Sequence, residues 1–184
     1  MIPAKLAASL RDQTRQTLSL PGFAESAVLV PIVVDEQGAH LLFTVRRPDL
    51  RTHAGQISFP GGKRDPEDAD LAATALREME EELGIPRSQV EVLGLLDDVP
   101  TPSSYVITPV VGLVTGPLHI VAQASEVAET FTASVAMLRD PAVYHADGER
   151  TWRDVTYVMH EYRVDDRRIW GATARMVHQL LSLL

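Results

Sequence analysis

The chain has 184 residues, no cysteine, and 45% hydrophobic against 23% charged residues, which is the composition of one globular domain with its own core. Its formal net charge of −8 argues against nucleic acid and anionic membranes as partners, because both repel an acidic surface. The lack of cysteine excludes disulfides and thiol chemistry, and the lack of a long apolar run or export signal predicts a cytoplasmic protein with no membrane contact.

Hydrophobic periodicity predicts a mixture of helices and strands along the chain. Helices are expected at 5–18 and 172–184, and strands at 27–34, 40–45, 90–96, 106–114 and 155–163. This order predicts layered α/β packing. Residues 1–25 are expected to form a helical extension packed on a single domain that spans 26–184.

A third helix is expected between Asp65 and Gly84, directly after the FPGG turn at 59–62. Asp65 is suited to cap the first turn, Pro66 fits the first helical position, and Gly84 can end the last turn. Four apolar residues recur at helical spacing and are expected to face the core: Ala72, Leu76, Met79 and Leu83.

Three glutamates of this helix, Glu78, Glu81 and Glu82, are predicted to project away from the core as a metal site. Carboxylates at i, i+3 and i+4 lie about 5–6 Å apart at Cβ, so they repel one another unless a cation lies between them. Oxygen ligands of this kind suit Mg²⁺ or Mn²⁺. For an arbitrary acidic triplet, a solvated helix face would be the better interpretation.

Two sequence segments decide between a metal site and a solvated helix face. The segment 77–85, REMEEELGI, with its upstream glycine pair, resembles the signature of the Nudix hydrolases, which cleave a nucleoside diphosphate linked to another group. The segment 41–62, LLFTVRRPDLRTHAGQISFPGG, resembles the additional signature of the coenzyme A pyrophosphatase branch. Segments 105–112, 125–131 and 169–175 are similar as well. The segment differs from the usual Nudix signature in two ways. Ala69 stands where the signature has a glutamate, and the spacing from Gly62 to Arg77 is one residue longer.

The resemblance implies a fold and a reaction. The fold is an α/β/α sandwich around a mixed β-sheet, with the acidic helix as one wall of a cleft. The reaction is hydrolysis of the pyrophosphate bond of coenzyme A or its thioesters, with Mg²⁺ or Mn²⁺, to 3′,5′-ADP and (acyl-)4′-phosphopantetheine. Two alternatives remain open: a pyrophosphatase acting on ADP-ribose or another nucleoside diphosphate derivative, and a non-catalytic nucleotide sensor. The expected partner is the small nucleotide itself, bound by a monomer or homodimer.

Roles for individual residues follow from the same resemblance. Metal ligands are expected from the glutamates and a backbone carbonyl of the glycine turn: Glu78, Glu81, Glu82 and Gly62. Arg77 is expected to hold a glutamate in place, Glu81 to take part in catalysis, and Glu126 to act as the base. Glu129 is the alternative base, and both residues would also fit the start of a short helix.

Basic residues in the 41–62 segment and beside it are candidates for binding substrate phosphates, because guanidinium groups can donate two parallel hydrogen bonds to phosphate oxygens. The candidates are Arg46, Arg51 and Lys63. Arg47 is supported by proximity alone, and His53 is more simply a polar surface residue.

Overall fold

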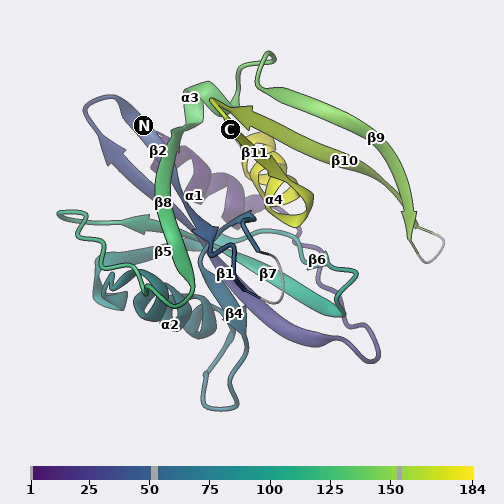
Figure 1. Cartoon of the computed structure of the whole chain (residues 1–184), viewed down its shortest axis with the longest axis horizontal. Helices are drawn as coiled ribbons and strands as arrows, with labels where there is room; N and C mark the ends of the chain where they lie inside the picture. The colour runs from purple at the N-terminus through teal and green to yellow at the C-terminus, as the bar shows by residue number, and fades with distance from the viewer. Residues whose placement is uncertain (1, 51–53, 153–154) are drawn as a thin grey trace.

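The computed structural model describes residues 2–50, 54–152 and 155–184 (Figure 1). The elements, in chain order, are α1 (Ile2–Asp12), β1 (Ala24–Asp35), β2 (Gly38–Arg46), β3 (Ile57–Ser58), β4 (Gly61–Lys63), α2 (Leu71–Leu83), η1 (Arg87–Gln89), β5 (Val90–Leu95), β6 (Val99–Pro100), β7 (Tyr105–Val114), β8 (Val127–Ser134), α3 (Val135–Leu138), β9 (Tyr144–Trp152), β10 (Val155–Val164), β11 (Arg167–Trp170) and α4 (Gly171–Ser182).

The central sheet has the order β3-β2-β1-β7-β5, with β4 also paired to β1 and β8 to β2. Strands β1 and β7 are parallel, while β2 and β5 run antiparallel to their neighbours, so the sheet is mixed. The register sets Gly62 opposite Ala27, and Arg46 opposite Val127. The glycine turn, the end of β2 and the start of β8 therefore lie at one end of the sheet.

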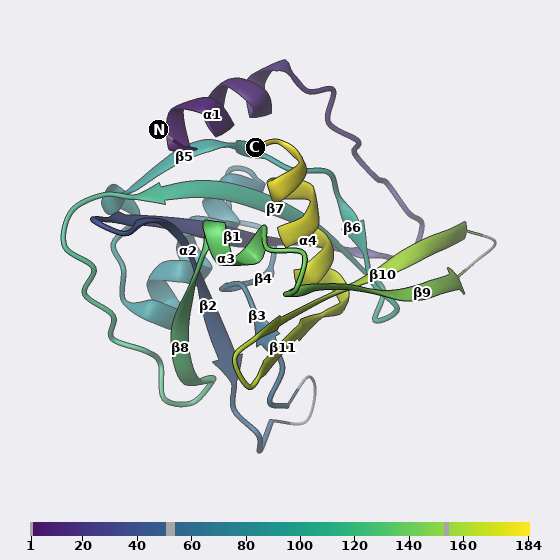
Figure 2. The same cartoon turned by 90° about the horizontal axis from the view of Figure 1, so that it is seen from above.

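The two faces of the sheet carry separate cores. Alternation along β1 sends Ala27 and Leu29 to one face, where they pack with Met79 and Leu83 of α2. It sends Val30 and Ile32 to the other face, where they pack with side chains of α1 and α4. Figure 2 shows α2 behind the sheet and α4 in front of it. The α/β/α sandwich around a mixed sheet is therefore confirmed, with one domain.

The predicted helix at 5–18 is too long. Helix α1 ends at Asp12, and the following residues run along the sheet, held by partners that a helix could not reach. Arg15 donates from Nε to the Leu96 carbonyl at 2.7 Å, and the amide of Leu18 donates to the Asp98 carboxylate at 2.8 Å. These tertiary hydrogen bonds outweigh the weak local preference for helix.

The start of the acidic helix is also corrected. Helix α2 begins at Leu71, and Asp70 rather than Asp65 is its cap, accepting from the amide of Ala73 at 2.8 Å. Residues 65–68 form a turn in which the amide of Asp65 donates to the carboxylate of Asp68 at 2.9 Å. The end is as predicted, because Gly84 takes the left-handed conformation, with φ of 68°, that closes the last turn.

A second sheet, β11-β10-β9, was predicted only in its central strand. Strand β9 carries charged and glycine residues that mask its pattern, and β11 is four residues long. The β9–β10 hairpin extends away from the body of the molecule (Figures 1 and 2). In the described part of the chain, no helix combines the length and apolarity needed to cross a membrane.

Candidate active site

The three glutamates of α2 differ in their surroundings. Glu81 is exposed, with 54% of its side-chain surface accessible, whereas Glu78 retains 17%. Glu82 is 5% exposed, so the prediction that all three project away from the core is wrong for this residue. Its carboxylate lies beside the glycine turn, where the amide of Gly61 donates to Oε1 at 3.3 Å. The turn therefore supplies a polar partner that lets a carboxylate enter the interior.

The glycine pair of the predicted turn lies in strand β4 instead, directly against the carboxylate of Glu78. A Cβ added to Gly62 would stand 2.5 Å from both Cδ and Oε1 of Glu78, so the end of the Glu78 side chain would have to move. The lack of a side chain at Gly62 therefore lets the backbone of β4 approach this carboxylate where it now lies. Any cation bound by Glu78 would lie within reach of this backbone.

Two of these carboxylates have a raised pKa. Burial raises the pKa of Glu82 to about 8, and the charges of Glu78 and Glu126 act in the same direction. The Gly61 amide and the Arg46 charge oppose the rise. Burial also raises the pKa of Glu78, again with a contribution from Glu126. Helix α2 and the loop before β8 thus share one electrostatic site, in which a cation would restore the charged forms.

Arg77 connects this site to Asp68. Its Nη1 donates to Glu78 at 2.8 Å and to Glu81 at 3.1 Å. Its Nε and Nη2 each donate to one oxygen of Asp68 at 3.0 Å, and this fork holds the pKa of Asp68 well below its usual range. Asp68 stands next to Ala69, the position where a glutamate was missing from the sequence motif. The spacing from Gly62 to Arg77 is one residue longer than in the usual motif, and this extra residue indicates that the acidic position moves from Ala69 to Asp68.

The donor set fits a hard divalent cation, although the side chains are not gathered into a cage. Within residues 2–50, 54–152 and 155–184, no three or more His, Asp or Glu side chains form a ready metal geometry. The reason is visible in the contacts, since the Arg77 guanidinium already serves as counter-ion to Glu78 and Glu81. Carboxylate oxygens and a close glycine backbone are the ligands that Mg²⁺ and Mn²⁺ prefer.

The loop before β8 is fastened to the end of α2. The amides of Val121 and Gln123 donate to the carbonyls of Leu83 and Glu82, both at 2.8 Å. At its other end, the amide of Arg47 donates to the Glu126 carbonyl at 3.0 Å, and the Arg47 guanidinium donates to the Ala124 carbonyl at 2.7 Å. Arg47, singled out in the sequence only by proximity, thus anchors the loop that carries Glu126.

Glu126 and Glu129 lie in different environments. Glu126 is close enough to Glu78 and Glu82 to raise the pKa of both. Glu129 is paired with Arg167 at 2.5 Å, and Arg167 also covers the ring of Phe131, which packs in the core on the α4 face. Residues two apart on a strand share a face, so Glu129 points away from α2. Neither residue begins a helix, because β8 starts at Val127.

The basic residues predicted to bind substrate phosphates lie in different environments. Arg46, at the end of β2, has a buried Nε with no hydrogen-bond partner among the described residues, and its charge lowers the pKa of Glu82. Lys63 is exposed at the end of β4, and its carbonyl accepts from Arg77 at 3.1 Å. Arg51 and His53 lie outside the described residues.

Comparison with known proteins identifies the family. The family model for the NUDIX domain matches residues 24–162. The chain is a Nudix hydrolase. The family's hydrolases act on nucleoside diphosphate derivatives and generally use divalent metals. Helix α2 carries most of the 77–85 segment that resembles the family signature, and it is therefore the Nudix helix of this enzyme.

Two relatives extend the match over most of the chain. The Nudix hydrolase NudL of Photorhabdus laumondii, whose name describes it as uncharacterized, is 40% identical over 156 residues, which are 84% of this Nudix hydrolase and 82% of that protein. NudL of Escherichia fergusonii is 38% identical over 179 residues, with 93% and 87% coverage.

Among solved structures, the Nudix hydrolase RenU of M. smegmatis has a TM-score of 0.54 at 24% identity, over 66% of this chain and 76% of its own. An Ap4A hydrolase of C. elegans has a TM-score of 0.51 at 16% identity, over 60% and 80%. Identities this low show that the fold is shared and nothing finer.

Proposed function

We propose that this Nudix hydrolase cleaves the pyrophosphate bond of coenzyme A or its thioesters, adding water to give 3′,5′-ADP and 4′-phosphopantetheine or its acyl form. The observation that carries the proposal is Arg46, whose Nε is buried beside the α2 carboxylates with no hydrogen-bond partner among the described residues. A buried donor without a partner is costly unless a ligand completes it, and a phosphate oxygen is the natural acceptor. Arg46 belongs to the 41–62 segment, which carries the resemblance to the coenzyme A branch.

The proposed site divides the work between residues. Glu78, Glu81, Glu82 and the backbone of Gly62 would hold Mg²⁺ or Mn²⁺, which supplies charge neutralisation for the pyrophosphate and a more acidic water. Glu126 accepts the proton of the attacking water, because it comes from a separate loop and faces the glutamates of α2. Arg77, itself held by Asp68, orients Glu78 and Glu81, and Glu81 also takes part in catalysis.

Substrate phosphates are bound by Arg46, with Arg51 and Lys63 in the same role. The 3′-phosphate is the group that separates coenzyme A from ADP-ribose and NADH. Each charge-assisted contact to it contributes about 1.5–3 kcal/mol, which is about one to two decades of discrimination. Selectivity of this size is measurable in kcat/KM.

The competing functions use the same site differently. An ADP-ribose hydrolase needs the α2 glutamates but gains nothing from a 3′-phosphate contact. A sensor that binds nucleotides without cleaving them needs neither the glutamates nor a base, yet Glu78, Glu81 and Glu82 are all present. Their presence favours an enzyme.

The test is a comparison of kcat/KM for coenzyme A, its 3′-dephospho form, ADP-ribose and NADH, with Mg²⁺ and with Mn²⁺. Coenzyme A is expected to be the best substrate, and product analysis should show 3′,5′-ADP. The variant Arg51→Ala should reduce cleavage of coenzyme A more than cleavage of the 3′-dephospho form. Faster cleavage of ADP-ribose than of coenzyme A would refute the substrate assignment while leaving the pyrophosphatase activity intact.

A further inference from the structure

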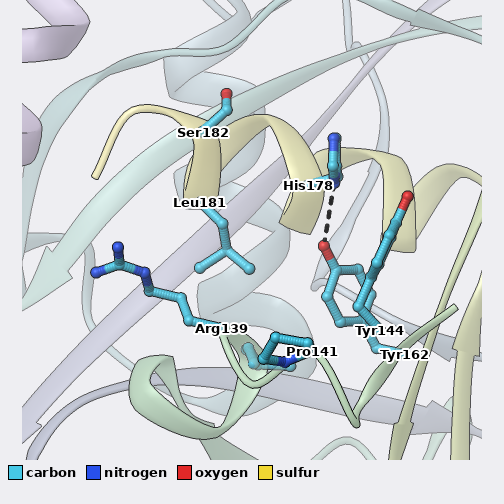
Figure 3. A pocket seen from close by; sticks show the side chains of 8 residues that line it. Arg139, Pro141, Tyr144, Tyr162, His178, Leu181 and Ser182 are labelled. Carbon is cyan, nitrogen blue, oxygen red and sulfur yellow. Dashed lines mark hydrogen bonds between the residues drawn. The ribbon is translucent and has the colours of Figure 1, made fainter.

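A second concave site lies on the α4 face of the sheet, opposite the Nudix helix. It is a pocket of about 320 Å³ between the segment after α3, the first residue of β9, the end of β10 and the last turns of α4 (Figure 3). Its lining consists of aromatic, aliphatic and few polar side chains: Leu138, Arg139, Pro141, Tyr144, Tyr162, His178, Leu181 and Ser182. Nothing in the proposed hydrolysis uses these residues.

One wall of the pocket is a fixed set of stacked rings. His178 stacks on Tyr144, with ring centroids 5.4 Å apart, and on His160 at 4.0 Å. Hydrogen bonds lock the stack, because the hydroxyl of Tyr144 lies 3.0 Å from Nδ1 of His160, and that of Tyr162 lies 3.4 Å from Nδ1 of His178. Figure 3 shows the Tyr162–His178 contact beside the pocket. The wall is therefore preformed.

This wall carries no charge at neutral pH. Burial lowers the pKa of His178, and burial together with the charges of His178 and Arg175 lowers the pKa of His160 to about 4. Tyr162 is almost fully buried and its pKa is raised by burial. Electrostatic attraction for a ligand must therefore come from another part of the lining.

Arg139 supplies that attraction at the mouth of the pocket. Its side chain is exposed, and among the described residues no carboxylate forms an ion pair with it. The neighbouring Asp140 uses its carboxylate to accept from the amide of Ala142 at 2.9 Å. In Figure 3, Arg139 lies on the side of Leu181 away from the rings. Arg139 therefore offers a positive charge to an anionic group at this pocket.

We propose that this pocket is a second ligand site that binds a small planar aromatic molecule carrying one anionic group, either a carboxylate or a phosphate ester. The ring would lie between Pro141, Leu181 and the edge of Tyr144, and the anionic group would accept from Arg139. Apolar and aromatic walls of this kind are typical of small-molecule sites. The proposal stands independently of which pyrophosphate the enzyme cleaves.

The experiment measures binding by the imidazole C–H resonance of His178 in proton NMR, assigned with the variant His178→Gln. Four probes separate the ring from the charge: phenyl phosphate and benzoate carry both, phenol carries the ring alone, and inorganic phosphate carries the charge alone. The variants are Arg139→Ala, Arg139→Lys, and Arg11→Ala as a control at an exposed arginine of α1. A reporter inside the pocket distinguishes this site from phosphate binding at α2.

Phenyl phosphate or benzoate should shift the His178 resonance saturably, at lower concentration than phenol or inorganic phosphate, and the tighter of the two identifies the anion. Arg139→Ala should weaken binding about tenfold, as expected for loss of one charge-assisted contact, and Arg139→Lys should weaken it less. Arg11→Ala should behave as wild type. No shift with either anionic ring up to about 10 mM, or equal affinities in wild type and Arg139→Ala, would overturn the proposal.

Discussion

The two faces of the central sheet both bury ionisable groups, but they stabilise them in different ways. On the α4 face, the tyrosine and histidine rings pair with one another and stay neutral. On the α2 face, burial raises the pKa values of Glu78 and Glu82, and the charge of a third carboxylate, Glu126, adds to the rise. The rings on the α4 face supply one another's hydrogen-bond partners, whereas the α2 face is left with unbalanced charge.

This difference indicates which face of the sheet carries the hydrolytic function. Carboxylates that repel one another in a partly dry site cost stability, and such a cost persists where a ligand removes it. The neutral rings on the other face carry no such cost at neutral pH. Variants that relieve the repulsion should therefore stabilise the metal-free protein and disable the enzyme, whereas variants on the α4 face should leave hydrolysis near normal.

The largest effect is expected for Glu82→Gln. An amide of the same shape removes a metal-ligand charge, so kcat/KM should fall by about 10³-fold or more, because metal catalysis supplies several kcal/mol. Hydrolysis rates over a range of Mg²⁺ concentrations measure this loss. Glu80→Gln is the matched control, since Glu80 pairs with Arg87 on the surface, and it should keep near-normal rates. Similar rates in both variants would refute the metal assignment.

The same variant should raise stability in the absence of metal. The pKa of Glu82 is about 8 in the folded protein and near 4.5 when unfolded, so the unfolded state holds fewer protons between these values. The free energy of unfolding therefore falls as pH rises from 4.5 to 8, and Glu82→Gln removes this fall. At pH 8 the gain should be about 1–3 kcal/mol by denaturant titration in EDTA. If Glu82→Gln were less stable than wild type, burial of the Glu82 carboxylate would not lower the free energy of unfolding.

Next in size is the comparison of Glu126→Gln with Glu129→Gln, which contrasts the two faces directly. Loss of a general base lowers rates by about 10²–10⁴-fold, so Glu126→Gln should reduce kcat at saturating metal while KM changes little. Glu129→Gln breaks an ion pair with Arg167 and should leave kcat near normal. The reverse order in steady-state kinetics would move the base to the α4 face.

A smaller effect is expected for Asp68→Asn, which removes a charge that holds Arg77. Loss of a supporting contact typically costs about 10–100-fold in metal affinity or activity. We expect the half-maximal rate to need a higher Mg²⁺ concentration, together with a lower Tm, and partial rescue by Asp68→Glu. Glu67→Gln, an exposed neighbour, is the control. A lower Tm with unchanged metal dependence would reduce Asp68 to a purely structural role.

The smallest effect concerns His160 on the α4 face. Its pKa of about 4 lies below the usual 6.5, so the unfolded state takes up a proton first as pH falls. The free energy of unfolding should decrease between pH 6.5 and 4 by about 1–2 kcal/mol, after allowance for solvent screening of a half-buried ring. The difference in slope between wild type and His160→Gln, from denaturant titrations, measures it. Equal slopes would contradict a neutral stack.

Local pattern was enough for the elements whose partners lie close in sequence. Gly84 ends α2 because only a residue that tolerates positive φ closes that turn, and this is visible in the sequence alone. The apolar spacing of Met79 and Leu83 predicted which side of the helix is buried. The prediction of a helix over 5–18 was wrong at its end because the partners there are distant in sequence. Arg15 donates to a carbonyl that lies about eighty residues away.

By itself, the sequence determined the family, the acidic helix and the two glutamates that compete as base, because each is a short pattern with local physical causes. Only the tertiary structure decided that Glu82 is buried, that Asp68 supports Arg77, and that Glu126 and Glu129 lie on different faces. These depend on strand pairing and on hydrogen bonds between distant segments, such as Gln123 with Glu82. Burial and charge coupling are properties of that packing, and no local pattern encodes them.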